Sequence, residues 1–255
     1  MASSNRGNEL RLTAVLLLAG AGVAWLVTVN RMRGMDMGPG TDLGGLGWLA
    51  GVWAVMMAAM MLPSLVPMAG TYAAQARARS RAGAPRALVQ TTLFVGGYLA
   101  IWILIGLAAW AVLTAVRSLD FSFLAWHEGG RYFAGAVIAA AGLYELTPLK
   151  ASCLRHCRDR GLLVAGWRGG LVGAARMGLA QGAYCIGSSW ALMAALFALG
   201  VMSITWMVVI AVVIAMEKLL PRYSLASRAA AALMLALAVG VALVPEHLPG
   251  LTIPT

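Results

Sequence analysis

The chain has 255 residues, of which 61% are hydrophobic and only 11% are charged, and its mean hydropathy is +0.83. A soluble globular domain is about 45–50% apolar and about 25% charged, so this composition excludes a soluble enzyme and indicates a protein embedded in a membrane. The net charge of +10 would in another setting suggest nucleic acid. On so few charged residues, a basic excess is more typical of the cytoplasmic loops of a membrane bundle.

Long uncharged runs bounded by charge, proline or glycine predict transmembrane helices, because about 20 apolar residues are needed to cross the hydrocarbon layer. Seven such runs follow one another along the chain, at residues 12–29, 46–68, 88–115, 132–148, 178–199, 204–220 and 229–244. No repeat and no long polar linker divides the chain. The sequence therefore predicts an all-α bundle of seven spans in a single membrane domain, residues 1–255. Most of the nine tryptophans lie near predicted span ends, as in an interfacial belt.

The distribution of lysine and arginine predicts the orientation. Fourteen basic residues lie in segments that face the cytoplasm if the N-terminus is inside, and four lie in the opposite loops. Because basic loops stay inside, we expect a cytoplasmic N-terminus in a multi-pass protein of a bacterial inner membrane. The lipid bilayer is then the main surrounding, and no nucleic acid is expected as a partner. Alternatively, the first span, which follows Arg6 and Arg11, is a cleavable signal peptide.

The second span carries four methionines at helical spacing. Met56 and Met60 are four residues apart, as are Met57 and Met61, so each pair stacks on one helix face. Thioethers are soft donors that select Cu(I) over ions such as Mg²⁺ or Ca²⁺. The alternative interpretation is that these methionines are flexible apolar filler in a packed bundle.

Two further features flank this span. The outer loop before it contains Met35-Asp36-Met37 between glycines, which resembles the methionine motifs that collect copper on the oxidising side of membranes; a plain flexible loop is the alternative. After the four methionines, Pro63 and Pro67 remove backbone donors and predict a kink. A break inside a membrane needs partners for the freed carbonyls, so we expect a buried polar cavity near the inner end of this span.

The three cysteines are expected at one level of the membrane. If a helix resumes after Pro148, Cys153 and Cys157 share one face with Cβ atoms about 5–6 Å apart and could hold one soft metal ion. Cys185 lies near the inner end of the fifth span, on the same side. A structural disulfide is disfavoured because the cytosol keeps thiols reduced. His156 points away from Cys157 on such a helix and is not expected to join the site.

Two glutamates are predicted at this level as well. An ionisable group at the bilayer centre costs about 2.5–3.5 kcal/mol and usually faces a partner or a cavity. We expect Glu217 to pair with its neighbour Lys218 near the headgroups. Glu145 has no basic neighbour nearer than Lys150. Three roles are open to Glu145: a metal ligand, a proton acceptor or a hydrogen-bond partner between helices.

Several motifs occur together between about residues 47 and 221. They are Met-Met-Ala-Ala-Met-Met-Leu-Pro at 56–63, Leu-Thr-Pro-Leu-Lys at 146–150 followed by Cys153-Leu154 and Cys157-Arg158, Tyr-Cys-Ile-Gly at 184–187 followed by Trp190, and Glu217-Lys218 before Pro221. Together they resemble a bacterial family of predicted metal-binding integral membrane proteins of unknown function, and the resemblance implies a bound metal. Family members often carry two cysteines before the tryptophan, where this chain has Ser188-Ser189. Two potential thiolate ligands are therefore missing.

Soft ligands at three depths predict a membrane protein that handles copper and relays Cu(I) to a membrane partner. In this hypothesis Met35 and Met37 capture the ion, the four methionines of the second span relay it, and Cys153, Cys157 and Cys185 hold it. The alternative is a non-catalytic accessory subunit of a larger membrane complex, whose methionines serve as packing. We do not expect an enzyme, because three scattered histidines provide no copper catalytic centre.

Overall fold

The computed structural model describes residues 2–32, 46–79, 83–117, 129–200 and 203–244. These residues form helices and no strand, which confirms the all-α prediction for this part of the chain. The helices are α1 (Ala2–Met32), α2 (Leu46–Arg79), α3 (Gly83–Arg117), α4 (Arg131–Tyr144), α5 (Pro148–Arg158), α6 (Arg160–Ala165), α7 (Gly170–Leu199), α8 (Ile204–Leu219) and α9 (Tyr223–Leu243).

Five of these helices, α1, α2, α3, α7 and α9, are long and apolar enough to cross a membrane. The pair α4 and α5, bent by 64°, makes a sixth if it is one broken span. Helix α8 has only 16 residues, fewer than the about 20 that a full crossing needs. Each predicted run corresponds to a helix, but seven full spans are not confirmed, and the orientation stays a prediction.

The predicted run 132–148 is wrong as one continuous helix. Helix α4 ends at Tyr144, and Pro148 begins α5 in a new direction. Proline disfavours helical geometry at the residue before it, and Thr147 is extended there. The Thr147 side chain then accepts a hydrogen bond from the backbone N–H of Lys150, which caps the new helix.

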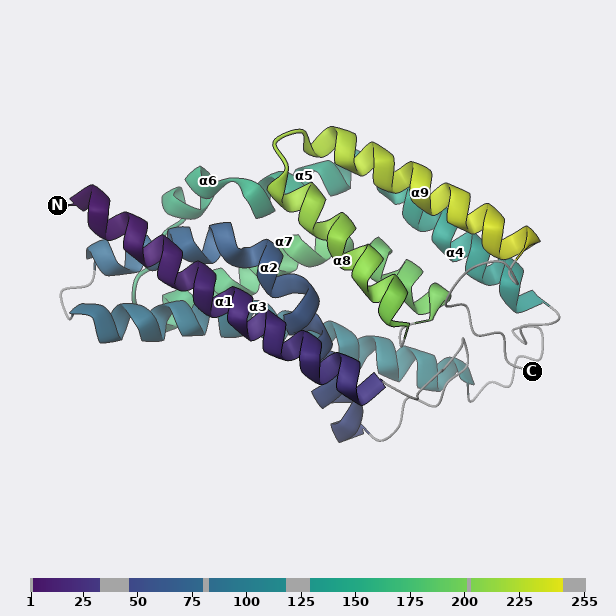
Figure 1. Cartoon of the computed structure of the whole chain (residues 1–255), viewed down its shortest axis with the longest axis horizontal. Helices are drawn as coiled ribbons and strands as arrows, with labels where there is room; N and C mark the ends of the chain where they lie inside the picture. The colour runs from purple at the N-terminus through teal and green to yellow at the C-terminus, as the bar shows by residue number, and fades with distance from the viewer. Residues whose placement is uncertain (1, 33–45, 80–82, 118–128, 201–202, 245–255) are drawn as a thin grey trace.

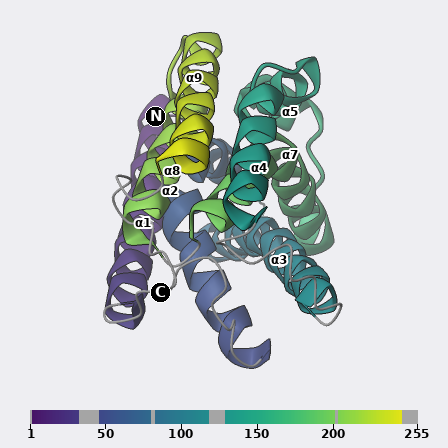
Figure 2. The same cartoon turned by 90° about the vertical axis from the view of Figure 1, so that its right-hand side faces the viewer.

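The helices pack as neighbouring pairs around α2. Helix α1 lies along α2, α3 along α7, and α4 along α9 (Figure 1). Viewed from the end, α2 lies between α1 on one side and α4, α5 and α7 on the other (Figure 2). Helix α2 is bent along its length and contains Pro63 and Pro67, in line with the predicted kink.

Helices α3 and α7 approach each other closely where α7 carries glycine. A Cβ atom added to Gly178 would overlap the carbonyl oxygen of Phe94, and one added to Gly182 would lie 3.0 Å from the carbonyl oxygen of Tyr98. Small residues allow two helix backbones to meet in this way. The close approach brings the side chain of Tyr98 against the middle of α7.

Aromatic side chains fill the space between α3 and α2. Phe94, Tyr98 and Trp102 are four residues apart on one buried face of α3. Phe94 stacks on Tyr72 of α2 with ring centroids 4.5 Å apart, and Trp53 Nε1 donates a hydrogen bond to the carbonyl oxygen of Trp102 at 2.8 Å. For Trp53 and Trp102, which are 6% and 0% exposed, the expected interfacial belt is therefore wrong. Their rings are needed between the helices.

Replacing Gly178 by alanine should lower the melting temperature, Tm, of the purified protein. The added Cβ meets the backbone of Phe94, which moves only if α3 and α7 separate. Overpacking of this kind costs about 1–3 kcal/mol. Thermal unfolding in detergent, followed by tryptophan fluorescence, measures the change.

Gly96→Ala is the matched control, because nothing lies within 4 Å of a Cβ at that position of α3. It should leave Tm unchanged or raise it, since alanine favours helix over glycine. An equal Tm for wild type and Gly178→Ala would contradict the close packing of α3 on α7.

Candidate metal centre

Helix α5 carries the first part of the site. It begins after the Thr147 cap, with Pro148 in its first turn, and this confirms that a helix resumes there. Lys150, Leu154 and Cys157 are its buried residues. Their spacing of four and three residues places them on one face, which packs against α7 and α8.

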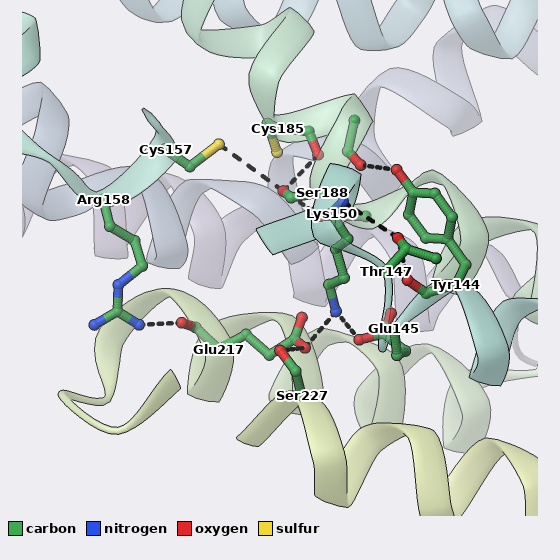
Figure 3. Close-up of polar contacts among 12 residues, drawn as sticks. Tyr144, Glu145, Thr147, Lys150, Cys157, Arg158, Cys185, Ser188, Glu217 and Ser227 are labelled. Atoms are coloured by element: carbon green, nitrogen blue, oxygen red, sulfur yellow. Dashed lines mark hydrogen bonds and ion pairs between the residues drawn. The ribbon is translucent and has the colours of Figure 1, made fainter. Parts of the chain in front are cut away.

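The side chains of Cys157 and Cys185 lie close together between α5 and α7. The two residues are 5% and 0% exposed, and each thiol acts electrostatically on the other. Ser188, one turn along α7, places its Oγ 3.9 Å from Cys157 Sγ and donates to the carbonyl oxygen of Cys185 at 2.9 Å (Figure 3). The hydroxyl of Tyr98 lies 3.0 Å from Cys185 Sγ. Two buried soft donors thus lie among polar side chains.

Lys218 connects this thiol pair to helix α2. Its Nζ donates to Cys185 Sγ at 2.8 Å and to Ser64 Oγ at 3.3 Å. Ser64 Oγ in turn donates to the carbonyl oxygen of Met61 at 2.9 Å. Polar side chains therefore do gather beside the two prolines of α2. One ammonium group lies between the thiols and the turn that carries the methionines.

The four clustered methionines of α2, at positions 56, 57, 60 and 61, lie in the core, each at most 2% exposed. Met57 and Met60 precede Ser64 by seven and four residues, so they lie on the helix face that Ser64 presents to Lys218. This arrangement brings thioethers to the side of α2 that faces the thiol pair. Burial by itself also suits the packing interpretation. The outer Met35 and Met37 lie outside the described residues.

Cys153 contacts α7 at a different place. A Cβ added to Gly187 would lie 2.6 Å from Cys153 Sγ, whereas Cys157 faces Cys185. Among the described residues, no three His, Cys, Asp or Glu side chains form a group that could hold a metal ion. His156 stacks on Tyr184 of α7 with ring centroids 4.6 Å apart. The three cysteines thus share the α5–α7 interface, but Cys153 Sγ lies against Gly187 whereas Cys157 Sγ lies near Ser188.

A buried ion cluster lies next to the thiols (Figure 3). Lys150 Nζ forms ion pairs with the carboxylates of Glu145 and Glu217, and all three residues are at most 4% exposed. Ser227 of α9 donates to Glu217 Oε1 at 2.8 Å. The guanidinium of Arg158 donates to the carbonyl oxygen of Glu217. Two carboxylates thus share one ammonium group.

The expected pairing of Glu217 with Lys218 is wrong. Side chains of consecutive residues leave a helix about 100° apart, so Glu217 turns to Lys150 while Lys218 turns to Cys185. Glu145 is engaged by Lys150 through Oε2, and its Oε1 has no hydrogen-bond partner among the described residues. A role of Glu145 as a metal ligand stays a prediction.

Sequence reasoning had not assigned Tyr98, Ser64 or Lys218 to the site. Each is a polar residue within a predicted membrane span, and that feature is visible in the sequence. The contacts of Tyr98 and Lys218 with Cys185, and of Ser64 with Lys218, are not visible there, because the three residues come from three different helices.

A family model described as PpoB2, copper chaperone, matches residues 50–241. The match includes the methionines of α2, the thiol pair and the ion cluster. No curated protein and no solved structure matches the chain.

Lys150→Met should destabilise the fold strongly. It leaves the carboxylates of Glu145 and Glu217 buried without their counter-ion, and removing one partner of a buried ion pair costs about 3–5 kcal/mol. Arg155→Met, at an exposed position of the same helix, should change little. Thermal unfolding in detergent compares the two, and equal Tm values would show that the ion cluster does not hold these helices together.

Proposed function

Because the chain belongs to the PpoB2 family of copper chaperones, we propose that it binds Cu(I) within the membrane and delivers it to a membrane partner protein. The main support is the buried pair of Cys157 and Cys185, of which Cys185 accepts a hydrogen bond from the ammonium group of Lys218. Thiolates and thioethers are the soft side chains that select Cu(I).

The charge of the site suits a monovalent ion. Two thiolates and one Cu(I) carry a net charge of minus one, and Lys218 supplies one positive charge 2.8 Å from Cys185 Sγ. An uncompensated charge in an apolar interior is costly, so this balance favours the loaded state. The Tyr98 hydroxyl can donate a further hydrogen bond to the same sulfur.

The methionines of α2 provide a route toward the thiols. Met60 lies one turn before Ser64, and Ser64 shares Lys218 with Cys185. Neutral thioethers bind Cu(I) without neutralising its positive charge, so the ion is expected to move on to the thiolates, which do neutralise it. In this proposal Met35 and Met37 collect the ion on the outer side.

Ser188 suits a carrier that must release its cargo. Its Oγ lies 3.9 Å from Cys157 Sγ, where a third donor would stand, and a hydroxyl is a harder donor than a thiolate. Two strong donors rather than three make the ion easier to transfer to a partner. A non-catalytic accessory role stays an alternative prediction, and copper binding distinguishes the two, since packing alone requires no metal.

Cys157→Ser and Cys185→Ser should each abolish tight Cu(I) binding. The purified protein is titrated anaerobically with Cu(I) against a coloured Cu(I) chelator. Loss of a residue that only hydrogen-bonds to a metal ligand already lowers metal affinity by about 10–100-fold. Loss of either thiol, which would bind the metal directly, should therefore lower the Cu(I) affinity by more than about 100-fold. Cys153→Ser is the control, because Cys153 packs on Gly187, and it should bind as the wild type does. A wild-type protein that takes up no Cu(I) would overturn the proposed function.

Replacing both Met57 and Met60 by leucine should slow the loading of the thiols severalfold. Leucine keeps the packing, at a cost below about 1.5 kcal/mol, but removes the thioethers. Stopped-flow mixing with a Cu(I) chelate follows the thiolate-to-copper absorption band. The control replaces Met207 and Met234, which are equally buried on α8 and α9. If both double variants load at the wild-type rate, the methionines of α2 are packing residues only.

A further inference from the structure

A pocket of about 470 Å³ lies between α5, α6 and the first half of α7. Its polar lining comes from His156 of α5, Arg168 of the α6–α7 connection, and Arg176, Gln181 and Tyr184 of α7. The remaining lining residues are apolar or glycine. The pocket is separate from the contacts of the thiol pair described above.

The charge of this pocket is positive. None of the described residues that line it is acidic, and no ion pair joins Arg168 or Arg176 to any described residue. The nearby Asp159 carboxylate is used by the backbone N–H groups of Gly161 and Leu162. Arg158, by contrast, is occupied by carbonyl oxygens of the α8–α9 region. Two guanidinium groups therefore remain available to an anion.

The pocket also lies at a boundary between charge and apolar surface. Arg176 is in the second turn of α7, a helix that is apolar and long enough to span a membrane. The exposed Leu179 and Tyr184 follow it along the same helix. If a lipid phosphate lies between Arg168 and Arg176, the acyl chains attached to it can lie along the apolar surface of α7.

We propose that this pocket binds the phosphate headgroup of an anionic phospholipid. The planar guanidinium groups match phosphate oxygens in pairs, and basic pockets between membrane helices bind such headgroups. In this proposal the bound lipid holds the α5–α6 segment against α7. Gln181, which lines the pocket, already links the two, because its Nε2 donates to the carbonyl oxygen of Cys157 at 3.2 Å. Lipid binding does not depend on copper.

The test uses the full chain, purified without copper in a neutral detergent, with phosphatidylglycerol or phosphatidylcholine added. Phosphatidylglycerol should raise Tm and stay bound in native mass spectrometry, and phosphatidylcholine should do neither. Both effects should disappear when Arg168 and Arg176 are replaced by alanine. They should persist when Arg155 and Arg160, which are exposed on the same segment but do not line the pocket, are replaced.

The Tm of each variant in phosphatidylcholine shows whether it is folded, so a failure to fold is recognised separately. Equal effects of the two lipids, or equal losses in the two double variants, would overturn the proposal. The experiment is also done with inorganic phosphate in place of lipid, which should change Tm little. If inorganic phosphate raises Tm as much as phosphatidylglycerol does, the ligand is a soluble anion and the lipid assignment is wrong.

Discussion

The ion pairs of the Lys150 ammonium group are the interaction on which the packing of α5, α8 and α9 depends. The ammonium group lies between the carboxylates of Glu145 and Glu217, and Ser227 completes the cluster. These four residues come from the α4–α5 bend, α5, α8 and α9, so one buried charge group joins four elements. Separating opposite charges in an apolar interior is costly, and the elements are therefore confined relative to one another. Helix α5 is held with Cys157 turned toward α7.

Helix α8 connects this ion cluster to the candidate metal centre through two consecutive residues. Glu217 completes the ion cluster, whereas Lys218 reaches Cys185 and Ser64. The helical rotation of about 100° between neighbours separates these roles. As a result, the element that anchors the fold also brings positive charge to the thiols. Helix α8, with 16 residues, packs against α2, α5, α7 and α9.

The soft donors come together for a different reason, which is close helix packing. Glycines on α7 let α3 approach until Tyr98 reaches Cys185, and the aromatic side chains of α3 pack on α2. Helix α2 then presents Met60 and Ser64 toward Lys218. The chain belongs to a copper chaperone family. Under the proposed function, these contacts would let a chain with only three cysteines and three histidines bind Cu(I).

The sequence by itself predicted where most of the long apolar helices lie, because hydropathy and helical spacing are local properties of the chain. It placed the stacked methionine pairs within α2 and allowed a helix to resume after Pro148, but it did not predict the break between α4 and α5. Only the tertiary structure decided which buried polar side chains contact one another. Lys150 and Glu217 are 67 residues apart, and Cys185 and Lys218 are 33 apart, so their pairing depends on how each helix is rotated and bent. The same rotations separated Cys153 from the thiol pair, because neighbouring turns of α5 meet different residues of α7.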